Sequence, residues 1–282
     1  MARKSIHLLL IDPQNDFCDL PDAECGGHHP ALPVPGAHAD MLRLAALIER
    51  AGNAIGGITV TLDTHRRHDI AHPGFWRQAD GSPVAPFTPI RAAEVKSGAF
   101  QPRNAELLPR VVAYLEALEA AGRYTHMVWP VHCEPGSWGH NLHEAVRRAC
   151  ARWEDMTGID AEKFLKGRSP LTEHYSAIRA EVPDPASPDT LVNDALLDRL
   201  ASADEKILVA GEAGSHCVKA TVEDILFYRP ETATRIVLLA DCMSPVAGFA
   251  AQQAAFIETL RARGARVAAA AEILPELREN AA

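Results

Sequence analysis

The sequence lacks the patterns that would assign it to several common classes of protein. No C-x-x-C pair is present, which excludes zinc ribbons and thioredoxin motifs, and no apolar run approaches the roughly 18 residues of a membrane span. Basic residues are outnumbered, 28 against 37 acidic, and the resulting net charge of −9 argues against a nucleic-acid binder. Neither G-x-G-x-x-G nor G-x-x-x-x-G-K-[ST] follows a predicted strand, which disfavours a nucleotide-binding protein. We therefore expect no nucleic-acid partner and no membrane partner.

The composition suits a folded protein with a large core. The 282 residues are 47% hydrophobic and 23% charged, which argues against global disorder. The six cysteines are too scattered to form a disulfide framework, so we expect reduced thiols and a cytoplasmic location. They are Cys18, Cys25, Cys133, Cys150, Cys217 and Cys242.

Short apolar runs alternate along the chain with longer stretches of helical spacing. The predicted strands are Ile6–Ile11, Gly57–Leu62, His126–Val131, Lys163–Lys166, Lys206–Ala210, Arg235–Ala240 and Arg266–Ala269. The predicted helices are Ala37–Ala51, Leu142–Arg152, Asp194–Ser202, Lys219–Phe227 and Gly248–Arg263. Strands separated by helices pair in parallel through right-handed crossovers. The pattern predicts an α/β fold with a mainly parallel central sheet and helices on both faces.

Two segments interrupt this alternation. His65–Arg103 is rich in Pro, Gly and His, and Pro183–Asp189 contains three prolines. Both are typical of functional loops or surface excursions rather than of domain linkers. We therefore predict one domain over residues 1–282, with a loop insertion at about 65–105.

Reactive side chains follow the ends of several predicted strands. They are Asp12, Asp63, His65, His132, Lys166 and Cys217. Any one of them alone would more often be structural, because an Asp after a strand usually caps a turn and a buried Cys usually packs as a small hydrophobe. In a parallel sheet these ends converge on one edge, where ligands bind. Together the six residues predict a functional site.

Cys217 has the surroundings of a nucleophile. It opens a predicted helix, where the positive end of the helix dipole should lower the pKa of its thiol and favour the thiolate. The turn Gly211–Gly214 before it can direct backbone N–H groups at one point, as an oxyanion hole requires. The alternative is an inert cysteine at a helix start. Cys133 and Cys18 are weaker candidates.

A carboxylate and two imidazoles among these residues suit a metal ion. Asp63 and His65 are two residues apart at a strand end, so both can point the same way, and His132 follows another strand. Such a set fits a divalent ion such as Zn, Fe or Mn with coordination positions left open. His68 and His72 are additional candidate ligands.

Five motifs in this order resemble the nicotinamidase branch of the isochorismatase-like cysteine hydrolases. They are IDPQNDF (Ile11–Phe17), LDTH (Leu62–His65), WPVHC (Trp129–Cys133), KG (Lys166–Gly167) and AGSHCVKATVEDI (Ala213–Ile225). They span the chain from Ile6 to about Val246, and five weak motifs in the family's order are specific. The resemblance implies a Rossmann-like sheet and a small-molecule hydrolase that forms homo-oligomers and acts in NAD salvage.

The resemblance also implies roles for individual residues. The catalytic triad would be Asp12, Lys166 and Cys217. The metal would be held by Asp63, His65 and His132, and His72 matches a further ligand better than His68 does. The substrate ring would lie between Phe17 and Trp129, with His216 and Tyr175 nearby. The oxyanion hole would use the N–H groups of Ala213 and Cys217, with a cis peptide bond before Ala213.

Three features depart from the family pattern. The spacing between His65 and the later His ligand is irregular, the loop Phe75–Pro102 is long, and Glu212 stands where the family has an apolar residue. If Glu212 is buried toward the thiol, we expect its carboxyl group to be neutral, to meet a basic group or to bond a polar substituent of the substrate. The alternative is that it turns away from the thiol entirely.

The function predicted from the sequence is hydrolysis of a small amide through a thioester, with nicotinamide giving nicotinate and ammonia. One alternative is another hydrolase of the superfamily, acting on a different amide, a ureide or a vinyl ether. The other is a catalytically silent binding module, which the filled triad positions disfavour.

Overall fold

The computed structural model describes residues 6–201 and 206–281, and its centre is a six-stranded sheet. The strands lie in the order β10-β9-β8-β1-β2-β7. Their bounds are β1 (Ile6–Ile11), β2 (Gly57–Asp63), β7 (Glu162–Lys166), β8 (Lys206–Gly211), β9 (Ile236–Leu239) and β10 (Arg266–Ala268). Every neighbouring pair is parallel, so the predicted α/β fold is confirmed.

The sequence of β1 explains its place inside the sheet. All six residues of IHLLLI are buried, and the strand pairs with β2 on one side and β8 on the other. Helices cover both faces of such a strand, so side chains on both faces are buried. Its sequence is therefore mostly apolar instead of alternating between apolar and polar residues. Asp12 follows directly and therefore enters the site from the middle of the sheet.

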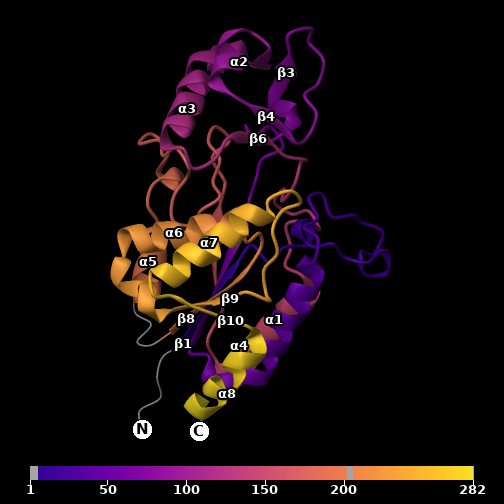
Figure 1. The fold of residues 1–282 in the computed structure, drawn as a ribbon. Helices are drawn as coiled ribbons and strands as arrows, with labels where there is room; N and C mark the ends of the chain where they lie inside the picture. The colour runs from indigo at the N-terminus through magenta and orange to yellow at the C-terminus, as the bar shows by residue number, and fades with distance from the viewer. Residues whose placement is uncertain (1–5, 202–205, 282) are drawn as a thin grey trace.

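Helices cover both faces of the sheet (Figure 1). On one face α1 (Ala37–Ala51) packs against α4 (Glu144–Thr157) and α8 (Ala270–Ala281). On the other lie α5 (Asp194–Ala201), α6 (Cys217–Tyr228) and α7 (Ala250–Ala262). The five predicted helices are confirmed, although Ser202, the expected end of α5, lies outside the described residues. Within the described ranges, no helix is both long enough and apolar enough to cross a membrane.

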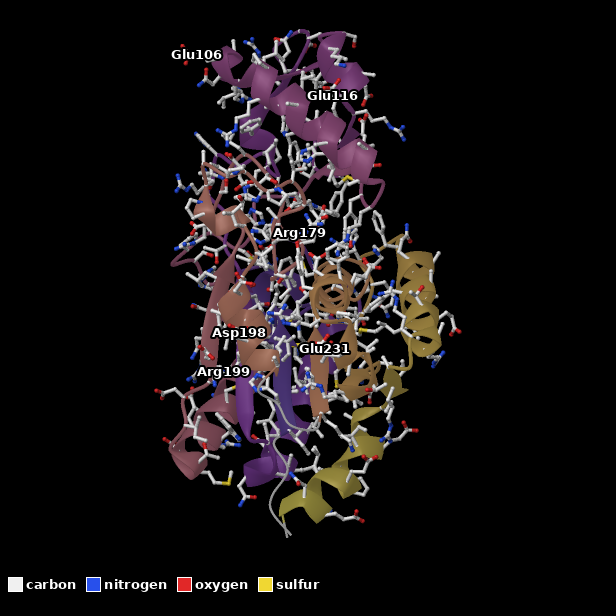
Figure 2. The ribbon with its side chains drawn as sticks, turned by 90° about the vertical axis from the view of Figure 1, so that its left-hand side faces the viewer. Glu106, Glu116, Arg179, Asp198, Arg199 and Glu231 are labelled. Carbon is white, nitrogen blue, oxygen red and sulfur yellow. The ribbon has the colours of Figure 1, made fainter. Side chains whose placement is uncertain are left out.

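Residues 70–128 form an upper lobe beyond the carboxyl ends of the strands (Figure 1). Its elements are β3 (Trp76–Gln78), β4 (Thr88–Ile90), α2 (Ala92–Lys96), β5 (Phe100–Pro102), α3 (Leu108–Ala121) and β6 (His126–Val128). Trp76, Tyr114 and Leu115 belong to a separate apolar cluster of this lobe. In Figure 2 the labelled Glu106 and Glu116 lie in the lobe, far from Asp198 and Arg199 on α5. The lobe therefore covers the edge of the sheet where the site is expected.

One predicted strand of the central sheet is wrong. The run His126–Val131 gives only β6, which pairs antiparallel with β4 in the upper lobe. Pro130 lacks the N–H needed to extend a ladder, and a short apolar run does not show which sheet a strand will join. The chain after β6 nevertheless returns to the sheet edge, because Trp129 N–H donates to the carbonyl of Ala71 at 2.7 Å.

The end of β8 approaches β1 so closely that only glycine fits there. A Cβ on Gly211 would lie 1.9 Å from the carbonyl oxygen of Ile11, and its φ of +122° is one that other residues rarely adopt. The neighbouring Asp12 also has a positive φ, 44°, which is uncommon for a residue with a side chain. Such conformations cluster at functional sites, where the surrounding structure maintains them.

Candidate active site

Four adjacent strands bring the predicted catalytic residues to one point. Asp12 follows β1, Asp63 ends β2 and Lys166 ends β7, while the loop after β8 leads to Cys217 at the start of α6. All four side chains are buried. The convergence predicted from the strand ends is therefore present in the structure.

Lys166 is the centre of this group. Its Nζ lies 2.9 Å from Oδ2 of Asp12 and 2.9 Å from Oδ1 of Asp63. The same ammonium contacts Sγ of Cys217 at 3.6 Å and donates to the carbonyl of His174 at 3.0 Å. A single cation thus links the thiol, the carboxylate of Asp12 and the carboxylate of the metal-type cluster.

The electrostatics of this group follow from its burial and its charges. Burial disfavours the charge on Lys166, but Asp12 and Asp63 outweigh it and hold its pKa well above the ordinary value. For Asp12, burial raises the pKa more than Lys166 lowers it, and Asp63 adds to the rise. Thr61 fixes this carboxylate by donating its hydroxyl to Oδ1 at 2.6 Å. Asp12 is therefore a stronger base than an exposed aspartate.

The thiol of Cys217 does not have the lowered pKa that its place at a helix start suggests. Burial raises the pKa of its thiol well above the ordinary value, and Asp12 and Asp63 add to this effect while Lys166 opposes it. The helix N-terminus and Lys166 cannot compensate for desolvation between two carboxylates. Asp12 is the carboxylate in contact with this thiol, and Lys166 contacts both groups.

The loop before α6 presents unused backbone donors next to the thiol. Within the described part of the chain, the N–H groups of Ala213 and Cys217 donate to no protein acceptor. The cis peptide bond expected before Ala213 is present. Gly214 allows close packing here, because a Cβ at this position would lie 2.0 Å from Oε1 of Gln253. The two free donors fit the predicted oxyanion hole.

The predicted metal ligands form a compact, buried cluster. Oδ2 of Asp63 lies 3.1 Å from Nε2 of His65 and 3.5 Å from Nε2 of His132. One candidate ligand atom from each residue lies within 4.8 Å of the others. This group of one carboxylate and two imidazoles could hold a divalent ion, which agrees with the donor set expected from the sequence.

His72 lies beside this cluster, whereas His68 does not join it. Nε2 of His72 is 3.2 Å from Nδ1 of His132, and its Nδ1 faces the carbonyl of Arg66 at 3.0 Å. Burial, with His132 and His65 nearby, lowers the pKa of His72 to about 2, so its ring is neutral. His68 is exposed. His72 remains the better candidate for a fourth ligand, although the cluster within 4.8 Å contains only the other three.

Supporting residues that the sequence did not reveal fix the metal-type cluster. Oδ2 of Asp69 lies 3.3 Å from Nδ1 of His65, the arrangement that orients ligand histidines in metal sites. Gln14 holds the backbone of Asp63 on both sides, accepting its N–H at 2.7 Å and donating to its carbonyl at 2.9 Å. Residues 64–69 form no helix, so the spacing of Asp69 from His65 does not indicate their contact, and nothing in the sequence indicates the partner of Gln14.

A small cavity joins the thiol to the metal-type cluster. It measures about 30 Å³. Its walls are Phe17, Leu32, Asp63, Trp129, His132, Glu173, Tyr175, Ala213, His216, Cys217 and Val246. All four predicted substrate-binding residues line it, and an aromatic ring could enter only if these walls move apart. A larger cleft of about 800 Å³ elsewhere contains none of the predicted catalytic or metal-binding residues.

Aromatic side chains define one wall of this cavity. The ring of His216 lies 5.4 Å from Trp129, 5.2 Å from Tyr175 and 4.7 Å from Phe249, measured between centroids. Trp129 also donates its indole N–H to the hydroxyl of Tyr175 at 3.1 Å. Burial, together with Lys219, lowers the pKa of His216 to about 4, so its ring is neutral at physiological pH.

Glu173 and Glu212 take different positions relative to the cavity. Glu173 was not predicted, yet it lines the cavity seven residues after Lys166, in a loop without a periodic pattern. Glu212 is fully buried but does not line the cavity, and its neighbour is the carboxylate of Asp40. Glu212 therefore turns away from the cavity, which was one of the expected alternatives, and it meets neither a basic group nor the cavity.

Comparison of the fold with solved structures relates this chain to known proteins, whereas comparison of the sequence does not. No protein-family model matches the sequence, and no curated protein sequence matches it. Solved structures with the same fold are nicotinamidases, pyrazinamidases and isochorismatase-like hydrolases. The resemblance stated from the sequence motifs is thus confirmed at the level of the fold.

Three of these structures are similar over nearly the whole chain. A nicotinamidase/pyrazinamidase from Acinetobacter baumanii has a TM-score of 0.62 and 16% identity, covering 97% of this chain and 100% of its own. The yeast nicotinamidase Pnc1p has a TM-score of 0.59 and 19% identity, covering 93% and 98%. A pyrazinamidase of Pyrococcus horikoshii, solved in complex with zinc, has a TM-score of 0.52 and 18% identity, covering 94% and 99%.

Proposed function

We propose that this protein is a cysteine amidohydrolase that converts nicotinamide to nicotinate and ammonia. The observation that carries the proposal is the contact of one lysine, Lys166, with both Asp12 and Cys217 at the wall of an aromatic cavity. The fold shared with nicotinamidases supports it.

The first half of the reaction forms a thioester. Asp12 takes the proton from Cys217 as its sulfur attacks the carboxamide carbon, and the N–H groups of Ala213 and Cys217 stabilise the negative charge on the oxygen. Asp12 then returns that proton to the nitrogen, the C–N bond breaks and ammonia leaves. Lys166 keeps the carboxylate and the sulfur in contact and stabilises the negative charge that passes between them.

The second half regenerates the thiol. A water molecule attacks the thioester carbon while Asp12 accepts one of its protons, and the C–S bond breaks to give the carboxylic acid. Asp12 returns the proton to the sulfur of Cys217. Because the thiol of Cys217 carries its proton at rest, every turnover needs Asp12 as the base. The raised pKa of Asp12 makes it a better base near neutral pH.

The residues present fit a metal ion. Asp63, His65 and His132 place one carboxylate oxygen and two imidazole nitrogens within 4.8 Å of one another, and Asp69 lies 3.3 Å from the other nitrogen of His65. These would hold a divalent ion, with His72 as a further candidate ligand. When bound, such an ion would supply a positive charge that attracts the ring nitrogen of the substrate and orients the amide. Phe17 and Trp129 would enclose the ring.

The test is a screen for ammonia release by the purified protein, with elemental analysis of the same sample. We expect nicotinamide and pyrazinamide to be hydrolysed faster than maleamate or ureides. Preference for a ureide or another amide would place the protein elsewhere in the superfamily. No release from any of these compounds by metal-loaded protein would contradict the proposal and favour a binding module or a vinyl-ether hydrolase.

A further inference from the structure

Glu212 places a carboxyl group in the interior on the far side of the loop that leads to Cys217. Its side chain is fully buried and lies outside the walls of the cavity. Oε2 accepts the backbone N–H of Ser244 at 3.1 Å, while Oε1 has no hydrogen-bond partner within the described residues. The proposed mechanism gives this residue no function.

Ser244 joins Glu212 to α1 and to the loop that carries the oxyanion donors. Its hydroxyl donates to Oδ2 of Asp40 at 2.5 Å, and its carbonyl accepts the N–H of Gly214 at 2.9 Å. The residue between Glu212 and Gly214 is Ala213, whose N–H is one of the two free donors. The carboxyl groups of Glu212 and Asp40 thus hold Ser244 from two sides.

The charges around Glu212 are mostly of its own sign. On α1, the carboxylate of Asp40 is the charge that acts most strongly on Glu212. Arg43 donates to Oδ1 of this Asp40 carboxylate. From the loop after β1, Asp19 and the thiol of Cys18 are nearby. Burial, and then Asp40, raise the pKa of Glu212 well above the ordinary value. Two ionised carboxylates here would repel each other, whereas one protonated carboxyl could donate to the other.

We propose that Glu212 is a positioning residue. It is buried beside Asp40, Ser244 bonds to both carboxyl groups, and a hydrogen bond donated by the Glu212 carboxyl to Asp40 fixes the segment that presents the Ala213 N–H. The hydrogen bond from Glu212 to Asp40 concerns the folded protein alone. The role of Glu212 in positioning the Ala213 N–H rests on the proposed amidase function. Glu212 touches no substrate and acts only through Ala213.

The shared proton has a definite effect on stability. An unfolded chain releases the Glu212 proton above the ordinary pKa of glutamate, about 4.3, while the folded protein retains it. Stability conferred by the protonated form is therefore greatest at acidic pH and declines as pH rises. Glu212→Gln keeps one donor and one acceptor but has no proton to release, so it avoids this decline. Glu212→Ala loses both hydrogen bonds at every pH.

The experiment compares melting temperatures of the wild type, Glu212→Gln and Glu212→Ala between pH 5 and pH 9. We expect the Gln variant to gain about 3 °C or more on the wild type across this range, and the Ala variant to melt below the Gln variant at every pH. Glu258→Gln, a substitution at an exposed site on α7, controls for removing a carboxylate. A constant difference between the Gln variant and the wild type would overturn the shared proton. Infrared difference spectra provide a second test, because the carbonyl band of a protonated carboxyl should be missing only in the Gln and Ala variants.

Kinetics with nicotinamide test the positioning role separately. We expect Glu212→Ala to lower kcat about tenfold or more with little change in KM, and Glu212→Gln to restore it. Unchanged kcat in a folded Ala variant would overturn the positioning role. Failure of the wild type to hydrolyse nicotinamide would instead count against the proposed function, and the melting temperatures would still decide whether the proton is shared.

Discussion

Cys217 and Cys133 are both buried near Asp63, but only Cys217 lines the cavity. Cys133 has a structural position, because its backbone N–H donates to Asp16 at 2.7 Å and its carbonyl accepts the N–H of His65 at 3.1 Å. Burial raises the pKa of both thiols. The contact of Cys217 with Lys166 therefore distinguishes the two cysteines better than thiol acidity does.

At Cys217, substitution by alanine should reduce kcat/KM for nicotinamide about a thousandfold or more, because no other described thiol reaches the cavity. The matched variant Cys133→Ala should stay within about tenfold of the wild type. Ammonia release by both variants, with circular dichroism to check folding, measures the difference. The reverse order of activities would exclude Cys217 as the nucleophile.

Many residues of the candidate site could be predicted from the sequence because they lie at or after the ends of strands. Such ends meet at one edge of a parallel sheet, whatever their separation in sequence. Asp12, Asp63, Lys166 and Cys217 are of this kind. Glu173 and Gln14 could not be predicted in this way, because loop packing places their side chains. The protonation of the thiol was also beyond the sequence, since it depends on desolvation and on distances between charges.

At the scale of elements, periodicity predicted the central sheet and missed the upper lobe. Strands of three residues, such as β3 and β5, are too short to show alternation. Helix α3 is different, because its buried residues Val111, Tyr114, Leu115 and Leu118 follow helical spacing that the sequence contains. The end of α3 matters for the site, since Tyr124 just beyond it stacks on His216 with 5.6 Å between ring centroids.

Arg123 attaches this end of α3 to the helix of the nucleophile. It donates to Asp224 at 3.0 Å, to Glu223 at 3.3 Å and to the carbonyl of Ala220, and Glu181 lies 3.6 Å away. In Figure 2 the labelled Arg179, which lies 3.8 Å from Asp224, is at the level between the upper lobe and α5. This network therefore lies where the lobe meets the sheet layer.

Replacing Arg123 with methionine should lower the free energy of unfolding by about 3–5 kcal/mol, because it leaves buried carboxylates without their main cation. The control is Arg261→Met on α7, whose exposed ion pair with Glu258 should contribute at most about 1 kcal/mol. Urea denaturation of both variants measures the two losses. Equal losses would show that the Arg123 network does not stabilise the junction.

For the whole molecule, a bound metal should appear as added stability. At a free zinc concentration of about 100 times Kd, binding to the folded state alone contributes about 2.7 kcal/mol, which should raise the Tm of a 282-residue chain by about 4–5 °C. His65→Ala should abolish this shift, and the exposed control His68→Ala should preserve it. Thermal unfolding with added zinc, manganese or iron measures the effect without any substrate. The same shift in His65→Ala would place the metal elsewhere.

The central position of β1 has a consequence for how the protein is made. Its register pairs Ile6 with Lys206, so the middle of the sheet joins the beginning of the chain to a strand synthesised much later. The ribosome must synthesise the segment from β1 through β8 before these two strands can pair. Until then one edge of the apolar strand β1 has no partner. The upper lobe, by contrast, has an apolar cluster of its own and is synthesised well before β8. The upper lobe, which covers the active site, is therefore synthesised before the sheet below it is complete. During that interval the unpaired edge of β1 is exposed to aggregation.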